Sequence, residues 1–278
     1  MEAIIERIQE YRNAVLDALK KSNNHYGSQK IKIKVNDKSI EYYRWLHPYQ
    51  GRWELDALFN KEELVNISKL IKPNSIVLDI GAQTGNMAVA YSLYAKNVIA
   101  FEPNPAAFEV LEKNATCNLI TPYNFACSQE EGECEFHYSD PGLCNGGYAS
   151  VLDKGVGVTG HSLPLDVYMV NVTDFIKNNH TDDLNNISFI KIDAEGHDKE
   201  ILPTLKEIID LNKPIIQTEI YDGLTPNETD QLINVINDLG YKAYDMDTCN
   251  NNIDNLQDEI KSHKDIKPNS GHNLICLP

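Results

Sequence analysis

Ionisable side chains gather at the ends of two predicted strands, and their types suit proton transfer. One apolar run ends in Asp193, and Glu195 and His197 follow within four residues. Glu219 closes the next such run along the chain. A carboxylate or a neutral imidazole can remove the proton of an alcohol that acts as a nucleophile. Asp193 and His197 are therefore the candidate bases, with Glu195 and Glu219 as tuning groups.

The same residues have two other interpretations. Acidic residues stabilise helix N-termini, so Asp193 and Glu195 are also candidate helix-capping groups. Asp193 and Glu219 form a candidate metal site, because the carboxyl ends of neighbouring parallel strands meet at one edge of a sheet. Oxygen ligands without a His/Cys cluster favour Mg²⁺ or Mn²⁺ over Zn²⁺, and such an ion would bind a diol and lower its pKa. The residue types leave base-only and metal-assisted chemistry both open.

A second candidate site lies earlier in the chain, where VLDIGAQTG places Asp79, Gly81 and Gly85 at the end of a predicted strand. The next predicted strand ends at Glu102, whose carboxylate suits the two hydroxyls of a ribose. The pyrophosphate of a dinucleotide usually requires GxGxxG, whereas this chain has only GxxxG. S-adenosylmethionine (SAM) has no phosphate and carries a sulfonium cation and an amino group, which Asp79 suits. The spacing favours SAM over NAD, and an NAD-dependent oxidoreductase remains the alternative.

From residue 60 onward, apolar runs typical of buried strands alternate with helical patterns. This order predicts an α/β fold with a doubly wound, mostly parallel, seven-stranded Rossmann-like sheet whose last strand is antiparallel. Strands are expected at 75–80, 97–102, 123–128, 165–172, 188–193, 214–220, 241–246 and 273–278, with a shorter one near 132–139. Helices are expected at 60–71, 86–95, 105–118, 197–211 and 225–240. A further short helix is expected to begin after Thr173 as its cap, and Pro203 is expected to kink the helix at 197–211.

Residues 1–60 are predicted to form an N-terminal extension, and residues 61–278 the cofactor-binding domain. Within the extension, 4–20 has helical spacing, 31–35 alternates like a strand, and 40–58 is rich in aromatic residues. Two interpretations of the large aromatic side chains stay open. In the first, Trp45, Trp53 and Tyr148 line an acceptor pocket. In the second, Trp45 and Trp53 pack the extension onto the core.

Composition argues against several classes of protein. The formal net charge is −16, and so negative a surface repels phosphate backbones and anionic lipid, so we expect neither a nucleic-acid nor a membrane partner. No stretch approaches about 20 consecutive apolar residues. The N-terminus lacks a basic flank followed by an apolar run, so we expect a cytoplasmic protein. The six cysteines contain no CxxC pair, which indicates reduced structural thiols. The sequence leaves open whether the protein forms a homo-oligomer.

Four segments together resemble the FkbM family of class I SAM-dependent methyltransferases. They are VLDIGAQTGNMAVA, VIAFEPNPAAFEVLEKN, ISFIKIDAEGHDKEIL and PIIQTEI, and the resemblance covers about residues 50–278. The FEPNP and IKIDAEGH blocks are its most specific parts. The resemblance implies O-methylation of a hydroxyl on a sugar, a glycan or a glycosylated small molecule. Macrolide-pathway sugar O-methyltransferases that are similar here use a metal. A non-catalytic binding protein with a degenerate methyltransferase fold is a further alternative.

The resemblance also implies which residues hold the cofactor. Carried over by position, the SAM site comprises Asp79, Gly81, Gln83, Gly85, Asn86, Glu102, Asn104 and Ser128. Typical family members have Asn where this chain has Gln83, which puts the contact of that side chain in doubt. Asn104 of FEPNP is expected to shape the pocket.

Overall fold

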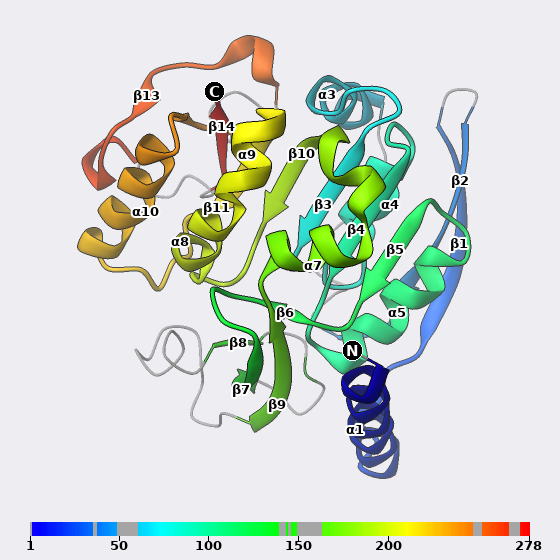
Figure 1. The fold of residues 1–278 in the computed structure, drawn as a ribbon. Coiled ribbons are helices and arrows are strands. Elements are labelled where there is room, and N and C mark those ends of the chain that lie inside the picture. The colour runs from blue at the N-terminus through cyan, green and yellow to red at the C-terminus, as the bar shows by residue number, and fades with distance from the viewer. Residues whose placement is uncertain are drawn as a thin grey trace.

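The protein is built around an eight-stranded sheet (Figure 1). The computed structural model describes residues 2–35, 38–48, 61–138, 143, 146–148, 163–246, 252–266 and 273–278. The strand order is β13-β12-β14-β11-β10-β3-β4-β5. These strands are β3 (Ile76–Ile80), β4 (Asn97–Phe101), β5 (Ile120–Tyr123), β10 (Ile187–Ile192), β11 (Ile215–Glu219), β12 (Lys242–Asp245), β13 (Glu259–Ile260) and β14 (Asn273–Leu277).

The predicted fold class is confirmed: β11, β10, β3, β4 and β5 run parallel, and β14 is antiparallel to β11. The sheet has one strand more than the seven predicted. The additional strand, β13, pairs with β12 over two residues and buries Ile260. It lies in a polar segment with no apolar run, which is why the sequence pattern did not indicate it.

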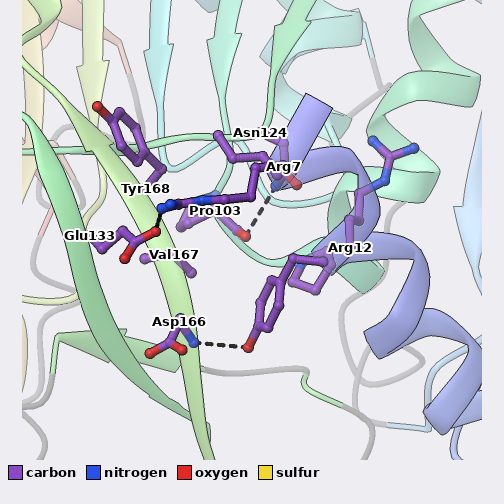
Figure 2. A pocket seen from close by; sticks show the side chains of 11 residues that line it. Arg7, Arg12, Pro103, Asn124, Glu133, Asp166, Val167 and Tyr168 are labelled. Atoms are coloured by element: carbon purple, nitrogen blue, oxygen red, sulfur yellow. Dashed lines mark hydrogen bonds and ion pairs between the residues drawn. The ribbon is translucent and has the colours of Figure 1, made fainter. Parts of the chain in front are cut away.

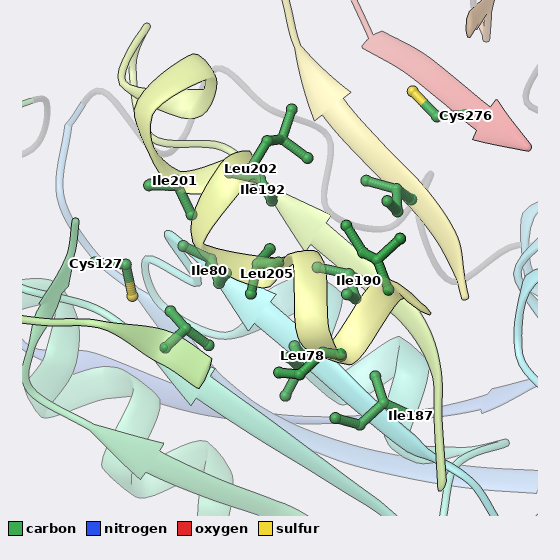
Figure 3. Packing of buried hydrophobic residues seen from close by; sticks show 14 of the residues in the cluster. Leu78, Ile80, Cys127, Ile187, Ile190, Ile192, Ile201, Leu202, Leu205 and Cys276 are labelled. Atoms are coloured by element: carbon green, nitrogen blue, oxygen red, sulfur yellow. The ribbon is translucent and has the colours of Figure 1, made fainter. Parts of the chain in front are cut away.

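Helices cover both faces of the sheet, because strand side chains alternate in direction and both faces are apolar. Ile76, Leu78 and Ile80 face one core, part of which Figure 3 shows, whereas Val77 faces the other. The first core includes α7 (Val172–Asn179), α8 (Asp198–Ile201), η3 (Leu202–Leu205), α9 (Lys206–Asn212) and α10 (Pro226–Asp238). The second includes α3 (Lys61–Leu70), α4 (Asn86–Ser92) and α5 (Pro105–Ala115).

Most helix boundaries follow local signals. Thr225 and Glu228 form the capping box of α10. The segment predicted as one kinked helix is divided into α8, η3 and α9, with Pro203 in the middle piece. The predicted Thr173 cap is wrong. Asn171 caps α7 by accepting from the Asp174 amide, while the Thr173 hydroxyl donates to the carbonyl of Thr204.

One predicted strand, 123–128, is wrong as a single element. The Asn124 side chain donates to the carbonyls of Glu102 and Pro103, at 2.7 and 3.0 Å, so the chain leaves the large sheet there. The residues that follow form β6 (Ala126–Cys127) in a separate sheet of order β6-β9-β7-β8. Its other strands are β7 (Gly132–Tyr138), β8 (Gly146–Tyr148) and β9 (Leu163–Val170), so the strand predicted at 165–172 also belongs here.

The N-terminal region contains α1 (Glu2–Lys21) and the antiparallel hairpin of β1 (Ser28–Val35) and β2 (Lys38–Trp45). The Tyr43 amide donates to Asn114 of α5, and Trp45 is buried and donates to the Tyr26 carbonyl. Trp45 is therefore a packing residue rather than part of an acceptor pocket. Three positions lie outside the described residues: Trp53, Asn60 at the start of the helix expected at 60–71, and the side chain of Tyr148. In the described ranges, no helix combines the length and apolar character of a membrane span.

Candidate functional site

Four strand ends meet at the carboxyl edge of the large sheet, in the spatial order β11, β10, β3, β4. The residues at or just after these ends are Glu219, Asp193, Gly81 and Glu102. The Asp193 amide donates to the carbonyl of Ile80, and the Gly81 amide donates to that of Phe101, both at 3.0 Å. The structure thus brings together the two candidate sites, whose residues Gly81 and Asp193 are 112 positions apart in the sequence.

The two glycines of the GxxxG turn occupy positions that a larger residue would disrupt. Gly81 has φ +75°, and a Cβ there would lie 1.9 Å from the carbonyl oxygen of Asp193. Gly85 has φ +78°, and its Cβ would lie 2.5 Å from Cδ1 of Leu111. Both glycines therefore allow the turn to pack against neighbouring chain. Gln83, between them, also adopts positive φ, at 50°.

Glu102 is buried and anchors the turns on both sides of it. Its Oε2 accepts from the Gln83 amide and its Oε1 from the Asn104 amide, each at 2.7 Å. Burial raises the pKa of this carboxyl to about 7, against the lowering effect of the two amides. Each carboxyl oxygen keeps a second acceptor position, so these contacts leave capacity for two hydroxyl donors.

Asn104 and Asn86 stand at the start of two helices. Asn104 caps α5, since its Oδ1 accepts from the amides of Ala106 and Ala107, and its Nδ2 donates to the Leu143 carbonyl. Asn86 is the first residue of α4, and its Oδ1 is buried without a hydrogen-bond partner in the described part of the chain.

Asp79 is completely buried, opposite Lys191 in the register of β3 and β10. The Lys191 ammonium lies 3.5 Å from Asp79 Oδ1, 3.2 Å from Asp193 Oδ2 and 2.9 Å from the Gly81 carbonyl oxygen. Burial alone would lower the pKa of Lys191, but Asp193 and Asp79 raise it above its ordinary value, so the ammonium stays charged. Sequence reasoning missed Lys191; the signal was a lysine between two isoleucines in an otherwise apolar strand.

The acidic residues around Asp193 differ in exposure and in protonation. The Asp193 side chain is 41% exposed, so it can face an incoming ligand. Burial, followed by the charge of Asp193, raises the pKa of Glu195 to about 8 and that of Glu219 to about 9. Glu219 also hydrogen-bonds Asp193. These two glutamic acids therefore hold protons at neutral pH.

Neither Asp193 nor Glu195 caps the following helix, since α8 begins after His197 without a hydrogen bond from any capping side chain. A further acid that sequence reasoning missed, Asp198, is the first residue of that helix. Its Oδ1 accepts from the Thr218 hydroxyl at 2.7 Å and from the Glu219 amide at 3.2 Å. Its Oδ2 accepts from the Ala194 amide at 3.1 Å. Asp198 is buried and joins the loop after β10 to the end of β11.

His197 and Ser128 are in contact although they follow strands of different sheets, β10 and β6. Ser128, just after β6, lies with its Oγ 3.0 Å from His197 Nε2. Burial, followed by the charge of Lys199, lowers the pKa of His197 to about 4, so the imidazole is neutral at pH 7. Ser128, predicted to hold the cofactor, is thus also tied to a candidate base.

Within the described ranges, no group of three or more His, Cys, Asp or Glu residues is arranged to hold a metal ion. The predicted metal pair, Asp193 and Glu219, instead shares a hydrogen bond. The Mg²⁺ expectation therefore gains no support from the side-chain arrangement.

A pocket of about 180 Å³ lies between α1 and the small sheet, as Figure 2 shows. Its floor includes Pro103 and Asn124, which belong to the segments that flank Glu102. Arg7 pairs with Glu133 across it, and the Tyr11 hydroxyl accepts from the Asp166 amide at 3.0 Å. These two contacts fasten α1 to the small sheet, and none of the residues predicted to be catalytic lines this pocket.

Comparison with known proteins identifies similar chains. Residues 79–243, more than half of the chain, match the family model described as the methyltransferase FkbM domain. The chain is 23% identical over 184 residues to the hexuronic acid methyltransferase AglP of Haloferax volcanii, covering 65% of this chain and 71% of that protein.

Solved structures with a similar fold include two methyltransferases. One is methyltransferase FkbM from Methylobacillus flagellatus, with a TM-score of 0.45 and 15% identity over 76% of this chain and 48% of that one. The other is the precorrin-6y C5,15-methyltransferase of Geobacter metallireducens, with a TM-score of 0.39 and 13% identity over 79% and 90% of the two chains. The match thus spans about half the length of the first solved chain.

Proposed function

This chain belongs to the FkbM methyltransferase family, and on that premise we propose that it transfers the methyl group of SAM to a hydroxyl of a sugar, a glycan or a glycosylated small molecule. The proposed sugar acceptor is supported by the relative from Haloferax volcanii, whose name specifies a hexuronic acid. The family membership favours this activity over the NAD-dependent alternative, and GxxxG lacks the third glycine of a dinucleotide site.

The observation that carries the proposal is the backbone contact between the Gly81 turn and the Asp193 loop. In the proposal, the turn holds the cofactor and Asp193 faces the acceptor, so the tight contact places the methyl donor next to the base. Glu102 would accept the ribose hydroxyls with its remaining acceptor positions. The sulfonium and amino groups of SAM suit the carboxylate-rich surroundings, where Lys191 neutralises only part of the negative charge.

The transfer itself requires alignment and one proton acceptor. The acceptor oxygen attacks the methyl carbon as the carbon–sulfur bond breaks, S-adenosylhomocysteine (SAH) leaves, and the hydroxyl proton passes to the protein. We assign Asp193 as the base, because its side chain is half-exposed, whereas the neutral Glu195 and Glu219 cannot accept a proton. His197 is the second candidate, although a pKa of about 4 makes it a weak base.

Calorimetric titration with SAM, SAH and NAD⁺, each with Mg²⁺ and with EDTA, tests the cofactor half of the proposal. Micromolar binding of SAM and SAH alone is the expected result, and binding of NAD⁺ alone would replace the methyltransferase by an oxidoreductase. A folded protein that binds none of them would favour the non-catalytic alternative.

The acceptor half is tested with methyl-labelled SAM and oligosaccharides of glucuronic and galacturonic acid. Methylation of a hydroxyl forms an ether, which survives mild alkali, whereas methylation of the carboxylate forms an ester, which releases methanol. Alkali-stable label is the expected result. Because a carboxylate needs no base, an ester product would also remove the role assigned to Asp193.

A further inference from the structure

The buried Lys191 is a charged group that the transfer mechanism above does not use. It is 7% exposed and lies in the middle of the large sheet, on β10, next to β3. An ammonium has three N–H donors, and Lys191 has three oxygen neighbours within 3.5 Å: the Gly81 carbonyl, Asp193 Oδ2 and Asp79 Oδ1. A buried lysine is costly unless it is paired, so this arrangement demands an explanation.

The three neighbours belong to different parts of the site. Gly81 lies on the turn proposed to hold the cofactor, and Asp193 lies on the loop proposed to face the acceptor. Asp79 is completely buried beneath both; its Oδ1 pairs with the Lys191 ammonium at 3.5 Å, and no other donor in the described structure hydrogen-bonds either oxygen. One neighbour therefore neutralises Lys191, and the other two are held by it.

The turn and the loop are also in direct backbone contact. A Cβ at Gly81 would lie 1.9 Å from the Asp193 carbonyl oxygen, and the Asp193 amide donates to Ile80. The backbone sets how closely the two segments approach, but it does not orient the Asp193 carboxylate. The Lys191 ammonium does, because it binds that carboxylate and the Gly81 carbonyl simultaneously.

We propose that Lys191 is a positioning residue that aligns the Asp193 carboxylate with the cofactor turn through its simultaneous contacts with Asp193 and Gly81. This proposal rests on the proposed function, since it requires a methyl donor on the turn. Alignment of donor and acceptor governs the transfer step more than it governs the binding of either molecule, and a misplacement of about 1 Å can cost on the order of 100-fold in rate.

The simpler explanation is that Lys191 only neutralises Asp79, and a double-mutant cycle separates the two roles. Lys191→Met leaves Asp79 buried without a countercharge and is expected to lower Tm or prevent folding. Asp79→Asn combined with Lys191→Met removes both charges and should restore Tm. The double variant therefore keeps the core neutral. Compared with Asp79→Asn alone, which measures the effect of Asp79 itself on cofactor binding, it lacks only the contacts of Lys191. Lys69→Met, at an ion-paired lysine on α3, serves as the matched control.

The readouts are the Kd for SAH, the NMR resonance of bound [methyl-¹³C]SAM, and the methylation rate with galacturonic acid oligosaccharides at saturating SAM. For the double variant, relative to Asp79→Asn alone, we expect a Kd for SAH within about threefold, a displaced methyl resonance, and a rate lowered at least about 30-fold. Lys69→Met should change none of these. The resonance reports the surroundings of the methyl group without an acceptor, so it is decisive even if the oligosaccharides are not methylated.

Two results would overturn the proposal. A double variant with the wild-type resonance and rate would show that Lys191 only neutralises Asp79. A Kd for SAH that weakens by as much as the rate falls would make Lys191 a cofactor-binding residue instead. Failure of the proposed function is seen separately, as folded wild-type protein that binds no SAH, and it would overturn the Lys191 role as well.

Discussion

Ser128 and His197 are in hydrogen-bond contact, with 3.0 Å between Oγ and Nε2, although they come from different sheets and lie 69 residues apart. Ser128 follows the short strand β6, and His197 precedes α8. The contact therefore links the small sheet to the carboxyl edge of the large one. Because the buried imidazole is neutral, one ring nitrogen donates and the other accepts, and the serine hydroxyl can serve either role.

The neutral His197 predicts a loss of stability in acid. Its pKa is about 4 in the folded protein and about 6.5 when unfolded, so the unfolded chain binds more protons between these values. Stability should fall as pH falls from 6.5 to 4, by about 3 kcal/mol relative to a His197→Asn variant. Urea unfolding of both proteins across this range measures the difference. Parallel stability curves would show that His197 titrates normally.

Glu219 predicts the opposite dependence. Its folded pKa of about 9 exceeds the usual 4.5, so the folded protein retains a proton that the unfolded chain has released. The stabilisation from this proton is complete below pH 4.5 and is lost as pH rises toward 9. The Glu219→Gln side chain stays neutral at all pH values. As pH rises from 5 to 8, the free energy of unfolding of this variant should therefore increase by about 2 kcal/mol or more relative to that of wild type. Glu207→Gln, at an exposed position of α9, is the control, and an equal gain there would refute the assignment.

Removing the base should separate binding from turnover. Asp193→Asn keeps the size of the side chain but cannot take up the proton of the attacking hydroxyl. Turnover should therefore fall about 100-fold or more, while SAH affinity changes little. His197→Asn should reduce turnover less. Single-turnover assays and calorimetry on the same samples give both quantities. If Asp193→Asn retains activity and His197→Asn does not, the base is His197.

Glu102 should contribute directly to cofactor affinity. Above the Glu102 pKa of about 7, Glu102→Gln keeps one backbone contact but loses a charged acceptor, so SAM binding there should weaken by about 1–3 kcal/mol. Calorimetry measures the change, and circular dichroism confirms that the turns at Gln83 and Asn104 persist. Unchanged SAM affinity in a folded variant would remove Glu102 from the cofactor site.

The close approach at Gly81 should make alanine costly there. Gly81→Ala combines a positive φ with a Cβ 1.9 Å from a carbonyl oxygen, whereas Gly240 has φ +82° and open space around its Cβ. Gly240→Ala therefore reports the conformational cost alone, about 1–2 kcal/mol. Thermal unfolding should show a distinctly larger loss for Gly81→Ala, or no folded protein. Equal losses would mean that the Asp193 loop moves aside freely.

Local patterns predicted the strands and helices that carry the candidate site. The apolar runs before Gly81, Glu102, Asp193 and Glu219 form neighbouring parallel strands, because burial on both faces leaves a clear signal in sequence. Local signals failed where two nearby residues compete. Asn171 caps α7 instead of Thr173, and the Asn124 side chain ends β5 where the apolar pattern continues.

The sequence by itself determined the α/β alternation, the glycine turn and the acidic residues at the strand ends, since each depends on the residue types of one short segment. Only the tertiary structure decided which of those acids is exposed and which ones hold protons. It also revealed two residues that sequence reasoning missed: Lys191, which pairs with Asp193, and Asp198, which joins the loop after β10 to the end of β11. The reason is that pKa values and ion pairs depend on burial and on strand register, which bring together residues more than 100 positions apart.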